Sequence, residues 1–177
     1  RPANHPLPPN TARHVGTRPE NQEIPAHVSA VADTGYATTG AVDGESIRTE
    51  EHLLSALHAY GITNLLIKVH GEIPVLDGSA LEFCDALEEV GIEEQESPRQ
   101  ELVIDKVYEV RDEDRVLRIE PADSFSVSYL LRYPPPIGEQ FFDFTLSSAD
   151  TYRRQIAPAR TFGFMRDLKM MNELGLG

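Results

Sequence analysis

The 177-residue sequence has no tryptophan and a single cysteine, Cys84. One cysteine cannot form a disulfide within the chain, which suits a reducing compartment. Cys84 lies in an apolar helical pattern without a neighbouring basic residue, so we expect a buried core thiol rather than a reactive thiolate. Long apolar runs are also missing, and the sequence therefore predicts no membrane span and no signal peptide.

Basic residues are scarce. Lysine and arginine total 16 against 29 aspartates and glutamates, which gives a formal charge of -13. So acidic a chain repels phosphate backbones, and nucleic acid is excluded as a partner unless a local basic patch exists. The nearest candidates are spread along the last thirty residues, where a solvated helix surface is the favoured interpretation over an anion site: Arg153, Arg154, Arg160 and Arg166.

The hydrophobic content of 40% is enough to fill one ordinary domain or two small ones. Residues 1–22 have no sustained period and indicate an irregular arm. The polar, acidic stretch 93–99 contains Pro98 and is the best boundary. We therefore predict a first α+β domain over residues 1–97 and a partial second α+β domain over residues 98–177.

Local patterns in the first half predict two helices. Thr49 is a candidate cap for a helix over residues 49–60, with Glu50 and Glu51 in its first turn. A second helix is predicted from a capping box, Ser79 with Glu82, up to Gly91. A short strand is expected over residues 23–31, a turn over 34–42 and a strand over 64–69.

The second half changes to strand patterns over residues 102–110, 116–120, 125–133 and 141–146, followed by helical patterns over 149–156 and 164–174. Each half thus has strands followed by helices, which favours an α+β fold made of two similar two-layer α/β sandwich domains, the second incomplete.

The most informative pair for chemistry is Glu51-His52, in the first turn of the first predicted helix. Adjacent helical side chains point about 100 degrees apart, so the two flank one pocket without sharing a metal face. That arrangement suits a metal-binding histidine beside a carboxylate that accepts a proton from water. Taken alone, a histidine near a helix start is more often a surface or core residue. The spacing of the other histidines adds no second ligand.

Four further positions have both a structural and a functional interpretation. Ser79 and Asp77 are best explained by the turn and helix start that they occupy. Thr161 and Phe162 lie in the segment 160–164, which combines a cation, a hydroxyl and two aromatics before a predicted helix. Core packing is the more common role for such a segment, and a ligand pocket is the alternative.

The chain resembles the zinc-dependent UDP-3-O-acyl-N-acetylglucosamine deacetylases of lipid A synthesis. The resemblance depends on five segments that stand in the family's order along the chain. They are residues 23–26 (EIPA), 33–34 (DT) with 38–39 (TT), 49–57 (TEEHLLSAL), 72–80 (EIPVLDGSA) and 159–167 (ARTFGFMRD).

The resemblance implies two similar domains with the active site between them, and hydrolysis of the acetamide of a UDP-linked, acylated glucosamine. His52 matches the family's first zinc ligand and Glu51 its general base. Thr161 matches the hydroxyl that stabilises the oxyanion, and Phe162 the region that lines the substrate and acyl-chain passage. The resemblance also implies a cytoplasmic protein, or an organellar one in a eukaryote.

The sequence lacks some segments of the family pattern. The family's other two zinc ligands and its catalytic histidine come from later segments that are not in this sequence, and both ends of the chain look cut. Glu50 stands where the family usually has an apolar residue, and Glu82 where proline is common. We therefore expect the 177 residues alone to be inactive. Two hypotheses remain: a zinc-dependent deacetylase, or a non-catalytic relative, a pseudoenzyme, that binds protein partners as a structural subunit.

Overall fold

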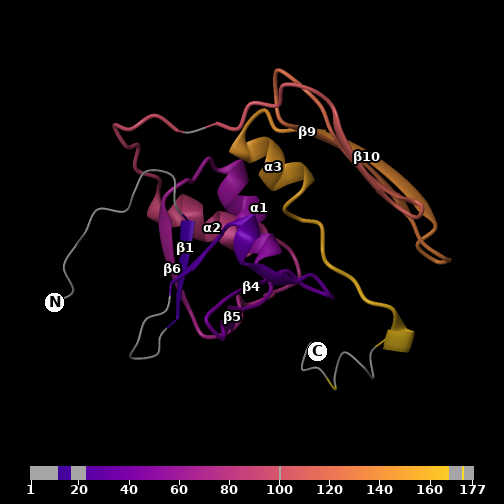
Figure 1. Cartoon of the computed structure of the whole chain (residues 1–177), viewed down its shortest axis with the longest axis horizontal. Helices are drawn as coiled ribbons and strands as arrows, with labels where there is room; N and C mark the ends of the chain where they lie inside the picture. The colour runs from indigo at the N-terminus through magenta and orange to yellow at the C-terminus, as the bar shows by residue number, and fades with distance from the viewer. Residues whose placement is uncertain (1–11, 17–22, 100, 168–172, 174–177) are drawn as a thin grey trace.

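The computed structural model describes residues 12–16, 23–99, 101–167 and 173. Figure 1 shows the arrangement of helices and strands, and within these residues the α+β fold class is confirmed. The helices are α1 (Glu51–Ala59), α2 (Leu81–Val90) and α3 (Ala149–Gln155), with 3-10 turns at Val28–Ala30 and Met165–Asp167. The strands are β1 (Ala12–Gly16), β2 (Glu23–Pro25), β3 (Val31–Asp33), β4 (Thr39–Val42), β5 (Glu45–Ile47), β6 (Leu65–Val69), β7 (Tyr108–Asp112), β8 (Arg115–Ile119), β9 (Ser126–Arg132) and β10 (Glu139–Thr145).

The first half forms two small sheets that pack against α1 and α2. In one, β1 pairs antiparallel with β2 and parallel with β6. In the other, β3, β4 and β5 form an antiparallel meander. Four buried residues, Ile24, Ala30, Ile47 and Ile73, make the core here, and Leu53 of α1 packs against them. The start of α1 is therefore anchored on the sheets.

The three helices meet in a second core cluster. Its buried members come from all three helices and their ends and from β10: Ala56, Ala80, Cys84, Phe144, Tyr152 and Ala157. The Ser55 and Tyr152 hydroxyls lie 2.6 Å apart, which links α1 to α3. Cys84 is fully buried, as the sequence predicted, and burial raises the pKa of its thiol.

The strands of the second half form two hairpins that extend from the helices (Figure 1). β7 pairs with β8, and β9 pairs with β10 over seven residues each, from Ser126 opposite Thr145 to Arg132 opposite Glu139. Phe144 is buried against the helices, whereas most other side chains of β9 and β10 are exposed. The division into two domains stays a prediction.

Several local predictions were wrong. Residues 12–16 form β1, although the whole of 1–22 was expected to be irregular, because β1 depends on pairing with the distant β6. Residues 39–42 are a strand rather than part of a turn. Residues 102–107, expected to be strand, lie ahead of β7. The helix expected over 164–174 is not one of these, because most of it lies outside the described residues; of those described, Met165–Asp167 form a 3-10 turn and Glu173 is helical.

Both predicted helix caps were also wrong in detail. Thr49 has a positive φ of 63°, and its hydroxyl donates to Glu72 Oε1 at 2.8 Å instead of capping α1. Glu50 is the N-cap residue of α1 and makes no side-chain capping bond. At α2 the capping box does not form: Ala80 is the N-cap, and Ser79 Oγ accepts only from the Leu81 N–H at 3.2 Å.

Candidate functional site

Glu51 and His52 occupy the first turn of α1, as predicted, and both are half-buried. Glu51 Oε2 accepts a hydrogen bond of 3.0 Å from the Thr38 N–H, in the turn between β3 and β4. Solvent therefore reaches both side chains, while one oxygen of the carboxylate has a fixed position. This is the environment that a proton-accepting carboxylate needs.

The residue before this pair attaches α1 to the neighbouring strand. Glu50 donates its backbone N–H to Thr38 O at 3.3 Å, and its Oε1 accepts from the Gly40 N–H at 2.9 Å. The Glu50 side chain is buried, and this burial raises the pKa of the carboxyl, although the Gly40 hydrogen bond opposes the shift. Two successive glutamates thus hold the helix start against the chain at residues 38–40.

Thr161 lies in an irregular segment after α3 that is attached to the turn before α2. Its N–H donates to Gly78 O at 2.8 Å, and the Ala80 N–H donates to Ala157 O at 2.9 Å. The Arg160 guanidinium contacts Asp77 Oδ2 through Nη2 at 2.9 Å. We call this set of contacts between residues 77–80 and 157–161 the clasp. The Thr161 residue itself is exposed.

Asp77 organises the turn on its side of the clasp. Its Oδ1 accepts from Ser79 Oγ at 2.6 Å and from the Ser79 N–H at 3.0 Å. These two bonds, with the bond from Arg160, lower the pKa of the Asp77 carboxyl to about 2. Both residues therefore have the structural roles that the sequence indicated, and Ser79 is not placed as a nucleophile.

Phe162 belongs to an aromatic cluster with Tyr133 and Phe164. Its ring centroid lies 5.6 Å from that of Tyr133 and 5.9 Å from that of Phe164, both in edge-to-face geometry. Phe162 is nevertheless 51% exposed. The three rings stabilise one another while leaving part of the Phe162 surface accessible.

The C-terminal arginines form ion pairs rather than an anion site. Arg153 Nη1 lies 2.6 Å from Asp85 and 3.4 Å from Glu88, both on α2. Arg154 pairs with Asp150 within α3. The favoured interpretation, a solvated and charge-balanced surface, fits these contacts. The Arg166 side chain lies outside what the structure describes.

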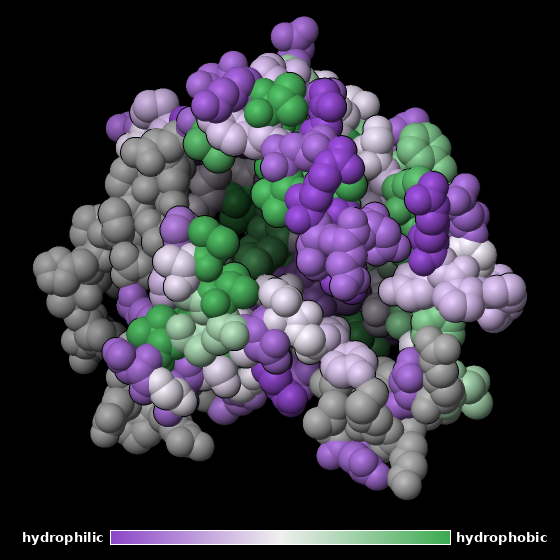
Figure 2. Space-filling view, turned by 45° about the vertical axis from the view of Figure 1, so that its right-hand side comes forward, coloured by the Kyte–Doolittle hydropathy of each residue, from purple (hydrophilic) through white to green (hydrophobic). Residues whose placement is uncertain are grey.

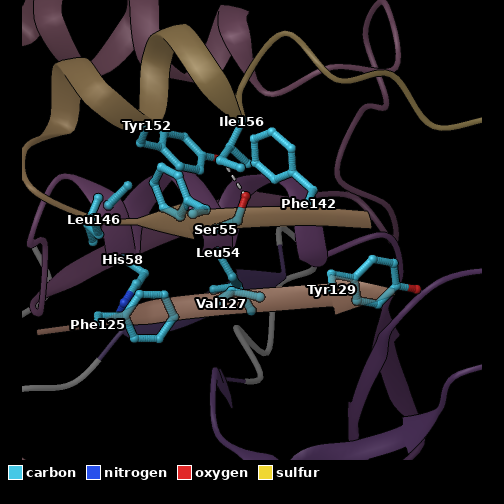
Figure 3. A pocket seen from close by; sticks show the side chains of 12 residues that line it. Leu54, Ser55, His58, Phe125, Val127, Tyr129, Phe142, Leu146, Tyr152 and Ile156 are labelled. Atoms are coloured by element: carbon cyan, nitrogen blue, oxygen red, sulfur yellow. Dashed lines mark hydrogen bonds between the residues drawn. The ribbon is translucent and has the colours of Figure 1, made fainter. Parts of the chain in front are cut away.

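The structure also contains a hydrophobic cavity of about 580 Å³ that the sequence patterns did not single out. Figure 3 shows it between α3 and the β9–β10 hairpin, with Tyr152 and Ile156 on one side and Phe125, Val127 and Tyr129 on the other. The alternation of these last three residues is the sequence signal that could have indicated it. Its lining also includes Leu54, Ser55, His58, Ala59, Phe142, Phe144 and Leu146.

Hydrophobic residues also gather around a hollow on the face shown in Figure 2. Leu54, one helical turn after Glu51 on α1, lines the cavity of Figure 3. The polar groups among its lining residues are the Ser55–Tyr152 hydroxyl pair, the Tyr129 hydroxyl and His58, whose ring packs edge-on against Phe125 at 4.7 Å. A cavity of this composition suits apolar groups and not phosphate.

The predicted zinc ligand, His52, has no companions that would complete a metal site in the described part of the chain. No group of three or more histidine, cysteine, aspartate or glutamate side chains is arranged there to hold an ion. Since a zinc site takes three or four protein ligands, the described residues do not fit a complete one. Nor does any hydrogen bond within residues 12–16, 23–99 and 101–167 join Thr161 to Glu51 or His52.

Comparison with known proteins decides the family. A family model described as LpxC, UDP-3-O-acyl N-acetylglycosamine deacetylase, matches residues 3–177. The chain belongs to this family. Curated relatives with the name UDP-3-O-acyl-N-acetylglucosamine deacetylase include one from Helicobacter pylori, 40% identical over 155 residues, which are 86% of this chain and 52% of that protein. Another, from Nitratiruptor sp., is 39% identical over 173 residues, or 97% of this chain and 58% of the relative.

The LpxC family membership confirms the resemblance drawn from the five sequence segments. A relative from Myxococcus xanthus is 40% identical over 155 residues, which cover 86% of this chain and 49% of that protein. The chain thus spans about half the length of the curated relatives that it matches. In the described residues no helix is long and apolar enough to cross a membrane.

Proposed function

We propose that the protein hydrolyses the acetamide of UDP-3-O-acyl-N-acetylglucosamine in lipid A synthesis, in the cytoplasm. The observation that carries the proposal is the position of Glu51: it is half-buried, in the first turn of α1, and anchored through Oε2 to the Thr38 N–H beside His52. The proposal concerns the whole protein, because this chain spans about half of its relatives.

In the proposed reaction Glu51 is the general base. The Thr38 N–H holds one carboxylate oxygen, and the second oxygen is the acceptor for a proton from water. Loss of that proton makes the water a nucleophile toward the amide carbonyl carbon. The proton then leaves with the amine, so that acetate and the free amine of the glucosamine are the products.

Thr161 would donate its hydroxyl to the oxyanion that forms on the carbonyl oxygen. One such donor is worth roughly 3 kcal/mol of transition-state stabilisation. The exposed residue and the backbone bond from Thr161 N–H to Gly78 O support this role, since the hydroxyl faces solvent from a fixed backbone. The exposed part of the Phe162 ring would contact the substrate beside it.

The LpxC family is generally zinc-dependent, and His52 is the ligand that this chain would offer. When bound, zinc polarises a carbonyl oxygen and lowers the pKa of a bound water. The described residues do not complete its ligand set. The roles proposed for Glu51 and Thr161 therefore rest on their own positions.

The test measures acetate release from UDP-3-O-acyl-N-acetylglucosamine by the purified native protein. Glu51→Gln keeps the size and the Thr38 hydrogen bond but removes the base, so kcat should fall by about 10²–10⁴. Glu82→Gln, on the first turn of α2, is the matched control and should keep full activity. A Glu51→Gln variant with wild-type turnover would contradict the proposed role.

The same preparation tests the alternative of a non-catalytic structural subunit. An enzyme should purify with about one zinc per protein and lose activity on treatment with a chelator. A subunit should instead be metal-free and inactive, and should co-purify with a protein partner in fixed ratio. The contacts of Ser55, Tyr152 and Arg153 are compatible with both an enzyme and a structural subunit. Metal content together with activity therefore distinguishes the two hypotheses.

A further inference from the structure

Thr161 depends on the clasp for its position because no regular element includes it. α3 ends at Gln155 and the 3-10 turn begins at Met165, so residues 156–164 between them belong to no helix or strand. The Thr161 N–H instead donates to Gly78 O at 2.8 Å, across 83 residues of sequence. This contact fixes the position of Thr161 because the tertiary structure holds the turn at Gly78 in place.

Asp77 joins the shape of that turn to the segment that carries Thr161. Its Oδ1 binds the N–H and hydroxyl of Ser79, and its Oδ2 binds Nε and Nη2 of Arg160 at 3.3 and 2.9 Å. The first oxygen therefore sets the turn, and the second holds the residue before Thr161. The low pKa of Asp77, about 2, keeps the carboxylate ionised in neutral solution.

Gly78 packs beside the threonine side chain. Its φ of +84° favours glycine, and a Cβ there would be in ordinary van der Waals contact with Thr161, 3.4 Å from Cγ2 and 3.7 Å from N. The methyl group of Thr161 thus faces the turn, which directs the hydroxyl to another side of the stiff, β-branched Cβ. In the part of the chain that the structure describes, this hydroxyl has no hydrogen-bond partner and is available to a ligand.

We propose that Asp77 and Arg160 are positioning residues for Thr161, whose hydroxyl they hold in the orientation that the reaction requires. The inference rests on the proposed function in that it takes Thr161 as the oxyanion donor. The Asp77–Arg160 ion pair affects the position of Thr161 and not the free energy of unfolding, because an ion pair at the surface contributes little to global stability. Arg160 and Asp77 have side chains that are 68% and 35% exposed. Their loss should therefore appear in turnover and not in the melting temperature.

The kinetic test compares Asp77→Asn and Arg160→Ala with the wild-type native protein. We expect each to lower kcat about tenfold or more with little change in KM, because a misplaced donor is felt in the transition state. The melting temperature should stay within about 2 °C of wild type. Arg160→Lys, which keeps the charge, should restore part of the turnover. Arg154→Ala removes another exposed ion pair, with Asp150, and should keep wild-type kcat.

A double-mutant cycle separates positioning from an independent effect. If Asp77 acts through Thr161, then adding Asp77→Asn to Thr161→Val should lower kcat no further. Additive losses, or single variants with wild-type kcat, would overturn the inference.

Hydrogen exchange at the Thr161 amide tests the clasp without any reference to activity. Asp77→Asn and Arg160→Ala should make this amide exchange at least about tenfold faster than in the wild type, because its bond to Gly78 O opens more often. Arg154→Ala should leave the exchange unchanged. Unchanged exchange in Asp77→Asn would refute the positioning role. Faster exchange in an inactive native protein would instead refute the proposed function and retain the clasp.

Discussion

The contact between Gly40 and Glu50 yields the sharpest stability prediction. A Cβ atom on Gly40 would lie 2.3 Å from Glu50 Oε1, far inside any normal contact distance. Gly40→Ala therefore forces the carboxylate to move. The carboxylate cannot move to water easily, because Glu50 is only 4% exposed, and it must give up the 2.9 Å hydrogen bond from the Gly40 N–H.

The magnitude follows from those two facts. A hydrogen bond to a charged group contributes about 1.5–3 kcal/mol. Replacing a strand glycine by alanine returns about 0.5–1 kcal/mol through the unfolded chain. We expect Gly40→Ala to lower the free energy of unfolding by about 1–2 kcal/mol. In a Glu50→Ala background the clash is gone, and Ile24 Cγ2 at 3.4 Å is an ordinary neighbour. There Gly40→Ala should be neutral or stabilising by about 0.5 kcal/mol.

The assay is urea denaturation of the native protein and the three variants, followed by circular dichroism. The double-mutant cycle should give a coupling free energy of about 2 kcal/mol between the two positions. Ser46→Ala, at an exposed position of β5, controls for general effects on this sheet. If Gly40→Ala costs the same with and without the Glu50 side chain, the steric and hydrogen-bond reasoning is wrong.

Two further predictions concern the core between the helices. Cys84 is fully buried, and the pKa of its thiol is raised. At neutral pH a thiol reagent should therefore label the native protein at least about 10²-fold more slowly than the protein in denaturant. Equal labelling rates would contradict the burial. Tyr152→Phe removes the hydroxyl that lies 2.6 Å from Ser55 Oγ and should cost about 1 kcal/mol of unfolding free energy, with a much smaller loss in a Ser55→Ala background; a full loss there would show that the α1–α3 link lies elsewhere.

The sequence by itself determined those helices and strands whose hydrophobic pattern involves only residues close together in the chain. The apolar period of 3.6 predicted α1, α2 and α3 to within about two residues, and the alternation in residues 125–133 predicted β9. The buried Cys84 and the place of Glu51 and His52 in a first helical turn followed from the same patterns. The five motif segments were also enough, by themselves, to indicate the LpxC family.

Tertiary structure decided whatever depends on residues far apart in the chain. β1 exists because β6, some fifty residues later, offers a parallel partner. Thr49 does not take its expected capping role because Glu72 accepts its hydroxyl. Arg160 and Asp77 meet across 83 residues, and the cavity forms only where α3 faces the β9–β10 hairpin. Periodicity records which face of an element is apolar, but only the packing of elements decides which partner each side chain finds.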